Sequence, residues 1–160
     1  MKKIIFTTLF LLGCVSIAYA FEIDGFKSGM SIQDAQEVLK KHSYVNIQVQ
    51  ENRIYAEHSV DNRFINIGFC NDKLVQFQKD LKPRFDYFTR LADEKRNELG
   101  KPLDAWSRPT DVSSNIESNS ITFLWKADDD IITVSYTEFP KNNQLSITYE
   151  TYNTCWKIPY

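Results

Sequence analysis

The sequence holds little of the material from which many common active sites are built. Its 160 residues include five glycines, two histidines and three cysteines. No Gly-x-Ser-x-Gly motif and no glycine-rich phosphate-binding loop occur. His42 and His58 are 16 positions apart, and there is no His-x-x-x-His or Cys-x-x-Cys spacing that would suit zinc. We therefore predict no catalytic residues, no metal site and no cofactor.

The sequence also has no cluster of basic residues. Nucleic-acid binding needs lysines and arginines gathered against phosphate, so we predict no nucleic-acid partner. Hydrophobic residues make up 42% and charged residues 25% of the chain. This balance is typical of a soluble globular domain, and it excludes a disordered chain or a membrane protein with several spans.

The first 20 residues have the pattern of a bacterial secretory signal peptide. Lys2-Lys3 is followed by an uncharged apolar stretch, Ile4–Val15, and then by the small-x-small sequence Ala18-Tyr19-Ala20. The apolar stretch is shorter than the roughly 20 residues that span a membrane. We therefore predict a cleaved signal at residues 1–20, no membrane span, and a periplasmic or secreted protein.

A second kind of processing is an alternative. The sequence Leu11-Leu12-Gly13-Cys14 resembles a lipoprotein cleavage box, in which Cys14 would carry the lipid anchor. Its signal would be only 13 residues long and would leave an unusually apolar tether, so cleavage after Ala20 is favoured. The mature chain would then have 140 residues, 17 basic and 21 acidic, with a net charge of −4.

The two cysteines outside the signal, Cys70 and Cys155, predict one disulfide. An even number of cysteines in an oxidising compartment is typical of a disulfide framework. The bridge would close a loop of roughly 85 residues, which is worth up to about 4–5 kcal/mol by loop-closure entropy. The alternative is a reactive thiol at Cys70, which would need a partner at His42 or His58.

The mature chain, 21–160, is predicted to form one α+β domain. Ser31 and Asp34 resemble a capping box and open an amphipathic helix over residues 31–42. A second helix begins near Pro83 and ends before Gly100, a typical helix-stop residue. Strands are predicted where apolar and polar residues alternate, and these segments are 46–50, 53–58, 64–69, 73–79, the vicinity of 106, 121–126, 132–137 and 145–150. Residues 110–119 are polar without periodicity, and we expect an exposed loop there.

The predicted elements follow the order helix, four strands, helix, four strands. This order suggests two pseudo-repeats, at about 21–81 and 82–160. Each strand has one apolar and one polar side, which is typical of an antiparallel sheet covered by helices on one face. We expect the other face to be solvated or available to a partner.

A family resemblance supports this architecture. Gly29-Met30-Ser31 opens a helix that ends near Leu39 and is followed by a β-meander, and Gly100-Lys101-Pro102 follows the second helix. These features resemble a class of small exported bacterial proteins. The class includes the small lipoprotein of the outer-membrane barrel-assembly machinery and the secreted β-lactamase inhibitor protein, which has two tandem helix-plus-four-strand units. The resemblance implies that fold and a protein-binding function, and it assigns no individual residue.

Aromatic residues are the most unusual positive feature, with 19 outside the signal. Many must be in the core, but some fall outside the inward-facing pattern or near the chain end. The residues that we predict to contact a partner are Leu124, Tyr152, Trp156 and Tyr160. The alternative is that Trp156 and Tyr160 close the core beside Cys155.

The densest carboxylates are Asp128, Asp129 and Asp130. Oxygen ligands could bind Ca²⁺, but no turn glycine or distal glutamate accompanies them, so we expect a solvated hairpin tip.

The sequence thus favours an exported, non-enzymatic protein that binds another protein as an inhibitor, an immunity factor or an assembly factor. One alternative is a small secreted hydrolase that would use Glu57 or His58 with a nearby carboxylate. Another is a carrier that holds a small hydrophobic ligand between its helices and its sheet.

Overall fold

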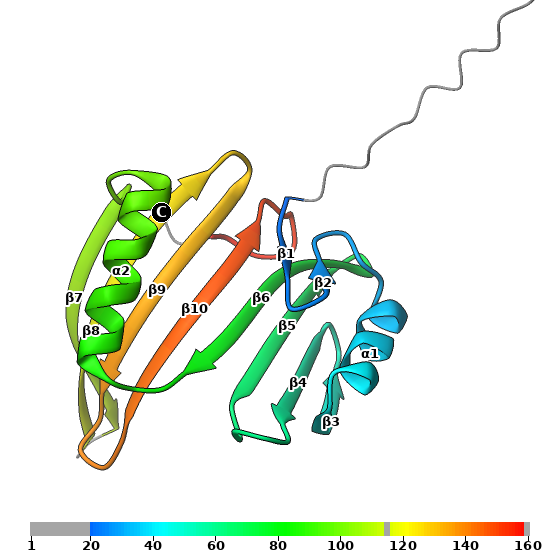
Figure 1. Cartoon of the computed structure of the whole chain (residues 1–160), viewed down its shortest axis with the longest axis horizontal. Coiled ribbons are helices and arrows are strands. Elements are labelled where there is room, and N and C mark those ends of the chain that lie inside the picture. Colours follow the sequence, from blue (N-terminus) through cyan, green and yellow to red (C-terminus); the bar gives the residue numbers. More distant parts are fainter. Residues whose placement is uncertain (1–19, 114–115, 159–160) are drawn as a thin grey trace, which may run out of the picture.

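The computed structural model describes residues 20–113 and 116–158, and these form two helices and ten strands (Figure 1). The helices are α1 (Ile32–Lys41) and α2 (Phe85–Leu99). The strands are β1 (Glu22–Ile23), β2 (Phe26–Lys27), β3 (Tyr44–Gln50), β4 (Arg53–His58), β5 (Phe64–Cys70), β6 (Lys73–Leu81), β7 (Asp104–Ser113), β8 (Ile116–Ala127), β9 (Asp130–Glu138) and β10 (Asn143–Thr151). No helix in the described ranges is long and apolar enough to cross a membrane.

Both helices begin and end where the local sequence signals predict. The backbone N–H of Asp34 donates to the Ser31 hydroxyl oxygen at 3.1 Å, so Ser31 caps the first turn of α1. At the end of α2, Gly100 has a φ of +85°, and its N–H donates to the Arg96 carbonyl at 2.9 Å. This backbone conformation favours glycine, and it explains why α2 stops there.

Eight strands form one antiparallel sheet in the order β3-β4-β5-β6-β10-β9-β8-β7, as the alternating sequence pattern predicts. The first four strands form one meander and the last four form another. They join in the middle of the sheet, where β6 pairs with β10 and Phe77 lies opposite Tyr149. This pairing holds the two halves of the chain in one continuous layer.

The two helices cover the same face of this sheet (Figure 1). Ile67, Phe77, Tyr149 and Ile132 lie opposite one another on four successive strands, so their side chains share that face. Ala35 and Leu39 of α1 pack with Ile67 and Phe77, whereas Phe88 and Leu91 of α2 pack with Ile132. Tyr149 contacts both groups and links the two halves of the core.

The expectation of a loop at 110–119 is wrong. β7 and β8 continue into this stretch as a long antiparallel pair. Pro109 lies within β7, the outermost strand of the sheet, where a missing N–H is tolerated on the unpaired side. The sequence conceals these strands because residues 110–120 are mostly polar, so no apolar alternation marks them.

The short β1–β2 hairpin was not predicted either. It places Phe26 against Phe77, with ring centroids 5.1 Å apart, and so closes one end of the core. Residues 1–19 of the predicted signal peptide, including Cys14, lie outside the described residues, as does Tyr160.

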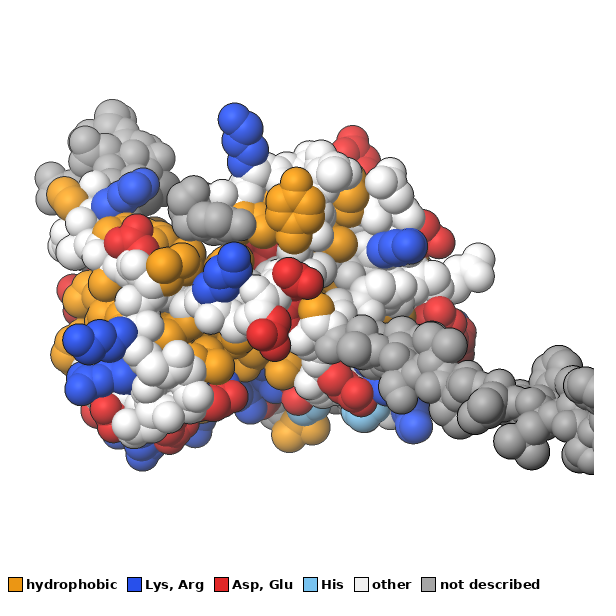
Figure 2. Space-filling view, turned by 90° about the horizontal axis from the view of Figure 1, so that it is seen from above, with side chains coloured by type: hydrophobic (Ala, Val, Ile, Leu, Met, Phe, Trp, Pro, Cys, Tyr) orange, Lys and Arg blue, Asp and Glu red, His pale blue; other side chains and the backbone are white. Residues whose placement is uncertain are grey.

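Exposed hydrophobic side chains occur at both ends of the molecule, and at the β3 end they include Val45, Val49 and Phe64. Figure 2 shows hydrophobic side chains gathered at the end that holds α2 and β8, between patches of charged side chains. Phe85 of α2 and Leu103 before β7 are also exposed.

Candidate functional site

The face of the sheet opposite the helices, here called the helix-free face, is polar along its central strands. Its residues follow from the register, because they lie between the positions that face the core. They include Asn66 of β5, Gln76 and Gln78 of β6, Thr148 and Glu150 of β10, and Thr133 and Ser135 of β9, with buried Ile131 of β9 as an apolar exception. The predicted division into one apolar and one polar face is therefore present in the structure.

The chain after β10 turns back across this face (Figure 1). Cys155 forms a disulfide with Cys70 at the end of β5, with Cα atoms 5.7 Å apart, as the sequence predicts. The disulfide brings the Trp156 ring onto Gly68 of β5. A Cβ atom at Gly68 would lie 3.1 Å from the Trp156 ring. Glycine therefore provides the space that lets the indole approach the strand this closely.

Trp156 belongs to a network that we call the tail cluster, made of Arg53, Asn66, Gln76, Glu150 and Trp156. The Glu150 carboxylate accepts hydrogen bonds from the Trp156 indole N–H and, at 3.2 Å, from the Gln76 amide. Arg53 donates to Gln76 at 2.9 Å and to Asn66 at 3.2 Å. Its guanidinium also lies 5.3 Å from the centre of the Trp156 ring. These bonds compensate the burial of Glu150, which is only 6% exposed.

A second arginine–tryptophan pair lies on the same face at the far edge of the sheet. In β7, the Arg108 guanidinium lies 5.9 Å from the centre of the Trp106 ring. Trp106 is opposite Thr122 of β8, whose hydroxyl is hydrogen-bonded to that of Ser135 at 2.8 Å. The helix-free face is thus polar in the middle and has an arginine stacked on a tryptophan toward each side.

The four predicted contact residues have different environments. Trp156 belongs to the tail cluster, and Tyr152 is 72% exposed. Leu124 is only 1% exposed, so its side chain offers no surface to a partner. Tyr160 lies outside the described residues.

Sequence reasoning missed Arg53, Gln76, Glu150, Trp106 and Arg108. The alternation of their strands shows that they face away from the core, but their proximity to one another depends on the strand order and on the disulfide.

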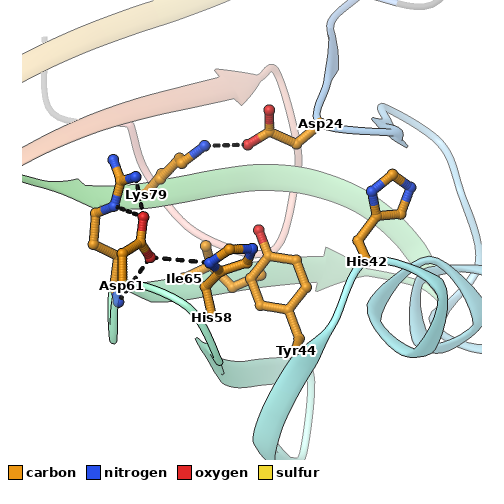
Figure 3. Close-up of a pocket in the computed structure, with 8 residues that line it drawn as sticks. Asp24, His42, Tyr44, His58, Asp61, Ile65 and Lys79 are labelled. Atoms are coloured by element: carbon orange, nitrogen blue, oxygen red, sulfur yellow. Dashed lines mark hydrogen bonds and ion pairs between the residues drawn. The ribbon is translucent and has the colours of Figure 1, made fainter.

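A small polar cavity of about 180 Å³ lies beside the β1–β2 hairpin and the end of α1 (Figure 3). We call it the His58 cavity. It is lined by Asp24, His42, Tyr44, His58, Asp61, Arg63, Ile65 and Lys79. The His58 Nδ1 atom is 3.0 Å from Asp61 Oδ1, and Lys79 forms an ion pair with Asp24.

Three groups that line the His58 cavity have shifted pKa values, and the hydrogen bond to Asp61 raises the pKa of Arg63. Hydrogen bonds from Arg63 lower the pKa of Asp61 to about 2. Burial, followed by the nearby negative charges of Asp24 and Asp61, raises the pKa of Tyr44 to about 12. Asp61 is therefore ionised and Tyr44 is a neutral hydroxyl across the physiological pH range.

This arrangement pairs His58 with a carboxylate, as the hydrolase alternative requires, but it does not include Glu57. The Glu57 carboxylate accepts a hydrogen bond from Asn46 at 2.8 Å and does not line the cavity. No serine, threonine or cysteine is among the described residues that line it. His58 could therefore act only on water or on a bound ligand.

The acidic turn differs from the expected solvated tip. Asp130 opens β9, is 5% exposed and lies between Ala127 and Thr151 in the sheet. Its Oδ1 atom has no hydrogen-bond partner. Burial and the adjacent charges of Asp129 and Asp128 raise the pKa of Asp130 to about 6. Across the described part of the chain, no group of histidine, cysteine or acidic side chains is arranged to hold a metal ion.

Comparison with protein-family models, with curated proteins and with solved structures found no match for this chain.

Proposed function

We propose that the protein is exported and binds another protein, in the bacterial envelope or outside the cell, through the helix-free face of its sheet. The observation that supports this proposal is the presence of two arginine–tryptophan pairs on that face, Arg53–Trp156 and Arg108–Trp106. Tryptophan and arginine are the residues most enriched among those that contribute most to binding in protein interfaces. The polar residues between the pairs would supply hydrogen bonds to the partner.

The spacing of the two pairs suits a protein-sized partner. Trp156 lies over β5 and Trp106 is in β7, five strand spacings away. At about 4.8 Å per strand, this separation is about 24 Å along the sheet. A standard interface buries about 800 Å² on each partner, a patch about 28 Å across. One globular partner could therefore contact both pairs at once.

The tail cluster would keep one of the two pairs in place before binding. Trp156 is held by the disulfide at the adjacent Cys155 and by its hydrogen bond to Glu150. Because these contacts already restrict the ring, little conformational entropy is lost when a partner packs on it.

We also propose that residues 21–81 and 82–160 are two related units, each a helix followed by four strands. The element order along the chain and the meeting of the units at β6 and β10 support this proposal. Such units, together with the signal-like N-terminus and the disulfide, agree with the resemblance to exported bacterial binding proteins.

The experiment that tests binding uses a matched pair of variants. The mature protein, tagged at its N-terminus, is incubated with an envelope fraction and cross-linked, and the captured proteins are identified by mass spectrometry. The test variant is Trp106→Ala/Arg108→Ala. The control is Tyr87→Ala/Arg90→Ala, which removes the cation–π pair on α2 at 5.2 Å and so leaves the helix-free face intact.

We expect one specific partner to be captured by the wild type and by the control and to be lost from the test variant. Removing a tryptophan and an arginine that a partner packs against typically costs more than about 2 kcal/mol, a loss in affinity of more than about 30-fold. Equal capture by the two variants, or the absence of a specific partner, would contradict the proposal.

The hydrolase alternative rests on one observation, the contact between His58 and Asp61 in the His58 cavity. It predicts turnover of ester or amide substrates that is lost in His58→Ala and retained in His42→Ala. Activity that is the same in both variants would remove this alternative.

A further inference from the structure

A second candidate site lies on the other side of the sheet, in an open groove between α2 and β8 that we call the aromatic groove. Its volume is about 380 Å³. The residues that line it are Phe85, Phe88, Thr89, Ala92, Asp93, Arg96, Pro102, Ile121, Phe123 and Trp125. We propose that this groove binds a single-chain amphiphile with a carboxylate head group, such as a medium-chain fatty acid.

The shape of the groove suits a linear apolar chain. Along α2, the lining residues run from Phe85 to Arg96, which corresponds to about 16 Å at 1.5 Å per residue. An extended chain of about twelve carbons is about 14 Å long, since each carbon–carbon bond of about 1.5 Å advances the chain by about 1.25 Å. The groove volume is more than twice that of a cavity of about 150 Å³ that holds benzene.

Apolar side chains line the groove on both sides. Ile121, Phe123 and Trp125 alternate along β8 and point toward α2, where Phe88 and Phe123 stack with ring centroids 5.7 Å apart. Phe85 is 50% exposed at one end. Figure 2 shows hydrophobic side chains gathered at the left of the molecule, the end that holds α2 and β8. Covering this surface with an alkyl chain would remove apolar area from water, which is the main favourable contribution to such binding.

The charges in the groove favour a negatively charged head group at the end near Pro102. Arg96 is exposed there, and its guanidinium has no ion-pair or hydrogen-bond partner among the described residues. The other charged residue of the lining, Asp93, lies nearly one turn earlier in α2 and accepts a hydrogen bond from the Asn97 amide at 3.4 Å. The Thr89 hydroxyl donates to the Asp86 carbonyl at 3.0 Å. A carboxylate placed beside Arg96 would give this arginine a partner.

Calorimetric titration of the mature protein with sodium dodecanoate, below its micelle concentration, tests the proposal. We expect a 1:1 complex with a dissociation constant below about 100 μM. Dodecylamine has the same chain with the opposite charge, and it should bind at least about fivefold more weakly.

Two variants of α2 separate the head-group contact from general electrostatics. Arg96→Gln should weaken dodecanoate binding about fivefold and leave the binding of uncharged dodecan-1-ol unchanged. Arg90→Gln removes the same charge from α2 outside the groove and should change neither. Both arginines are exposed, so the fold should persist, and circular dichroism would verify this.

The proposal is overturned if dodecanoate binds more weakly than about 1 mM, or if Arg90→Gln and Arg96→Gln have equal effects. This outcome is independent of protein binding at the helix-free face. The variant Trp106→Ala/Arg108→Ala should bind dodecanoate as the wild type does, so failure of one proposal leaves the other standing.

Discussion

Replacing Asp130 with asparagine should stabilise the protein near neutral pH. The side chain is buried at the start of β9, its Oδ1 atom has no hydrogen-bond partner, and two more aspartates precede it. In the folded state its pKa is raised from 3.8 to about 6. Folding near neutral pH therefore has to bury a carboxylate that is better solvated in the unfolded chain.

The size of the effect follows from the pKa shift. A difference of about 2.2 pKa units, at 1.36 kcal/mol per unit, is about 3 kcal/mol. Structural relaxation and water penetration reduce this figure, so we expect Asp130→Asn to gain about 1–3 kcal/mol at pH 7. For a protein of this size, that gain raises the melting temperature by roughly 3–10 °C.

The stability of the wild type should depend on pH in a direction that follows from the raised pKa of Asp130. The folded state binds the proton of Asp130 more tightly than the unfolded state, so wild-type stability falls as the pH rises from about 4 to about 6. The amide of Asp130→Asn does not titrate. The stability difference between the variant and the wild type should therefore be small near pH 4 and should reach its full size above pH 6.

Urea unfolding of both proteins at several pH values, followed by tryptophan fluorescence, measures this difference. The comparison variant is Asp129→Asn, which removes an exposed charge that raises the pKa of Asp130 but leaves the buried carboxylate in place, so it should gain less stability than Asp130→Asn. The reasoning is refuted if Asp130→Asn gains no stability at pH 7, or if its gain is the same at pH 4 and pH 7.

Three further predictions concern the segment that follows β10. Replacing both Cys70 and Cys155 with serine should lower the free energy of unfolding by about 2–5 kcal/mol, because the disulfide closes a long loop. An unchanged melting temperature would contradict this prediction. Gly68→Ala should lower the free energy of unfolding by about 1–3 kcal/mol, because the added methyl group would lie 3.1 Å from the Trp156 ring. An unchanged free energy of chemical unfolding would contradict this and show that the ring moves freely. Trp156→Phe keeps an aromatic ring but removes the indole N–H that donates to buried Glu150. It should lower the free energy of unfolding by about 1–3 kcal/mol. A decrease below about 0.5 kcal/mol would show that this hydrogen bond contributes little.

Local signals in the sequence predicted much of the fold. The Ser31 cap and the Gly100 stop fix the ends of the helices through hydrogen bonds within a few residues, so they are visible without knowledge of the fold. Alternation likewise revealed most strands, because one face of the sheet is apolar and the other is polar. It failed in the hairpin of β7 and β8, because the sequence of residues 110–120 is mostly polar.

The candidate site was far less predictable. Arg53 and Trp156 are distant in the sequence, and their contact requires that β4, β5 and β6 lie side by side and that the chain after β10 folds back over them. The exposure of Leu124 was also mispredicted from the sequence. Its position in the alternation suggested exposure, yet the folded chain buries it.

The sequence alone determined the two helices and most of the strands, because short-range patterns define them. It also predicted the pairing of Cys70 with Cys155. Only the tertiary structure decided which polar residues meet on the helix-free face, which charges line the His58 cavity and which aspartate of the acidic turn is buried. Those relations depend on strand order and chain reversal, which bring together side chains that no local pattern connects.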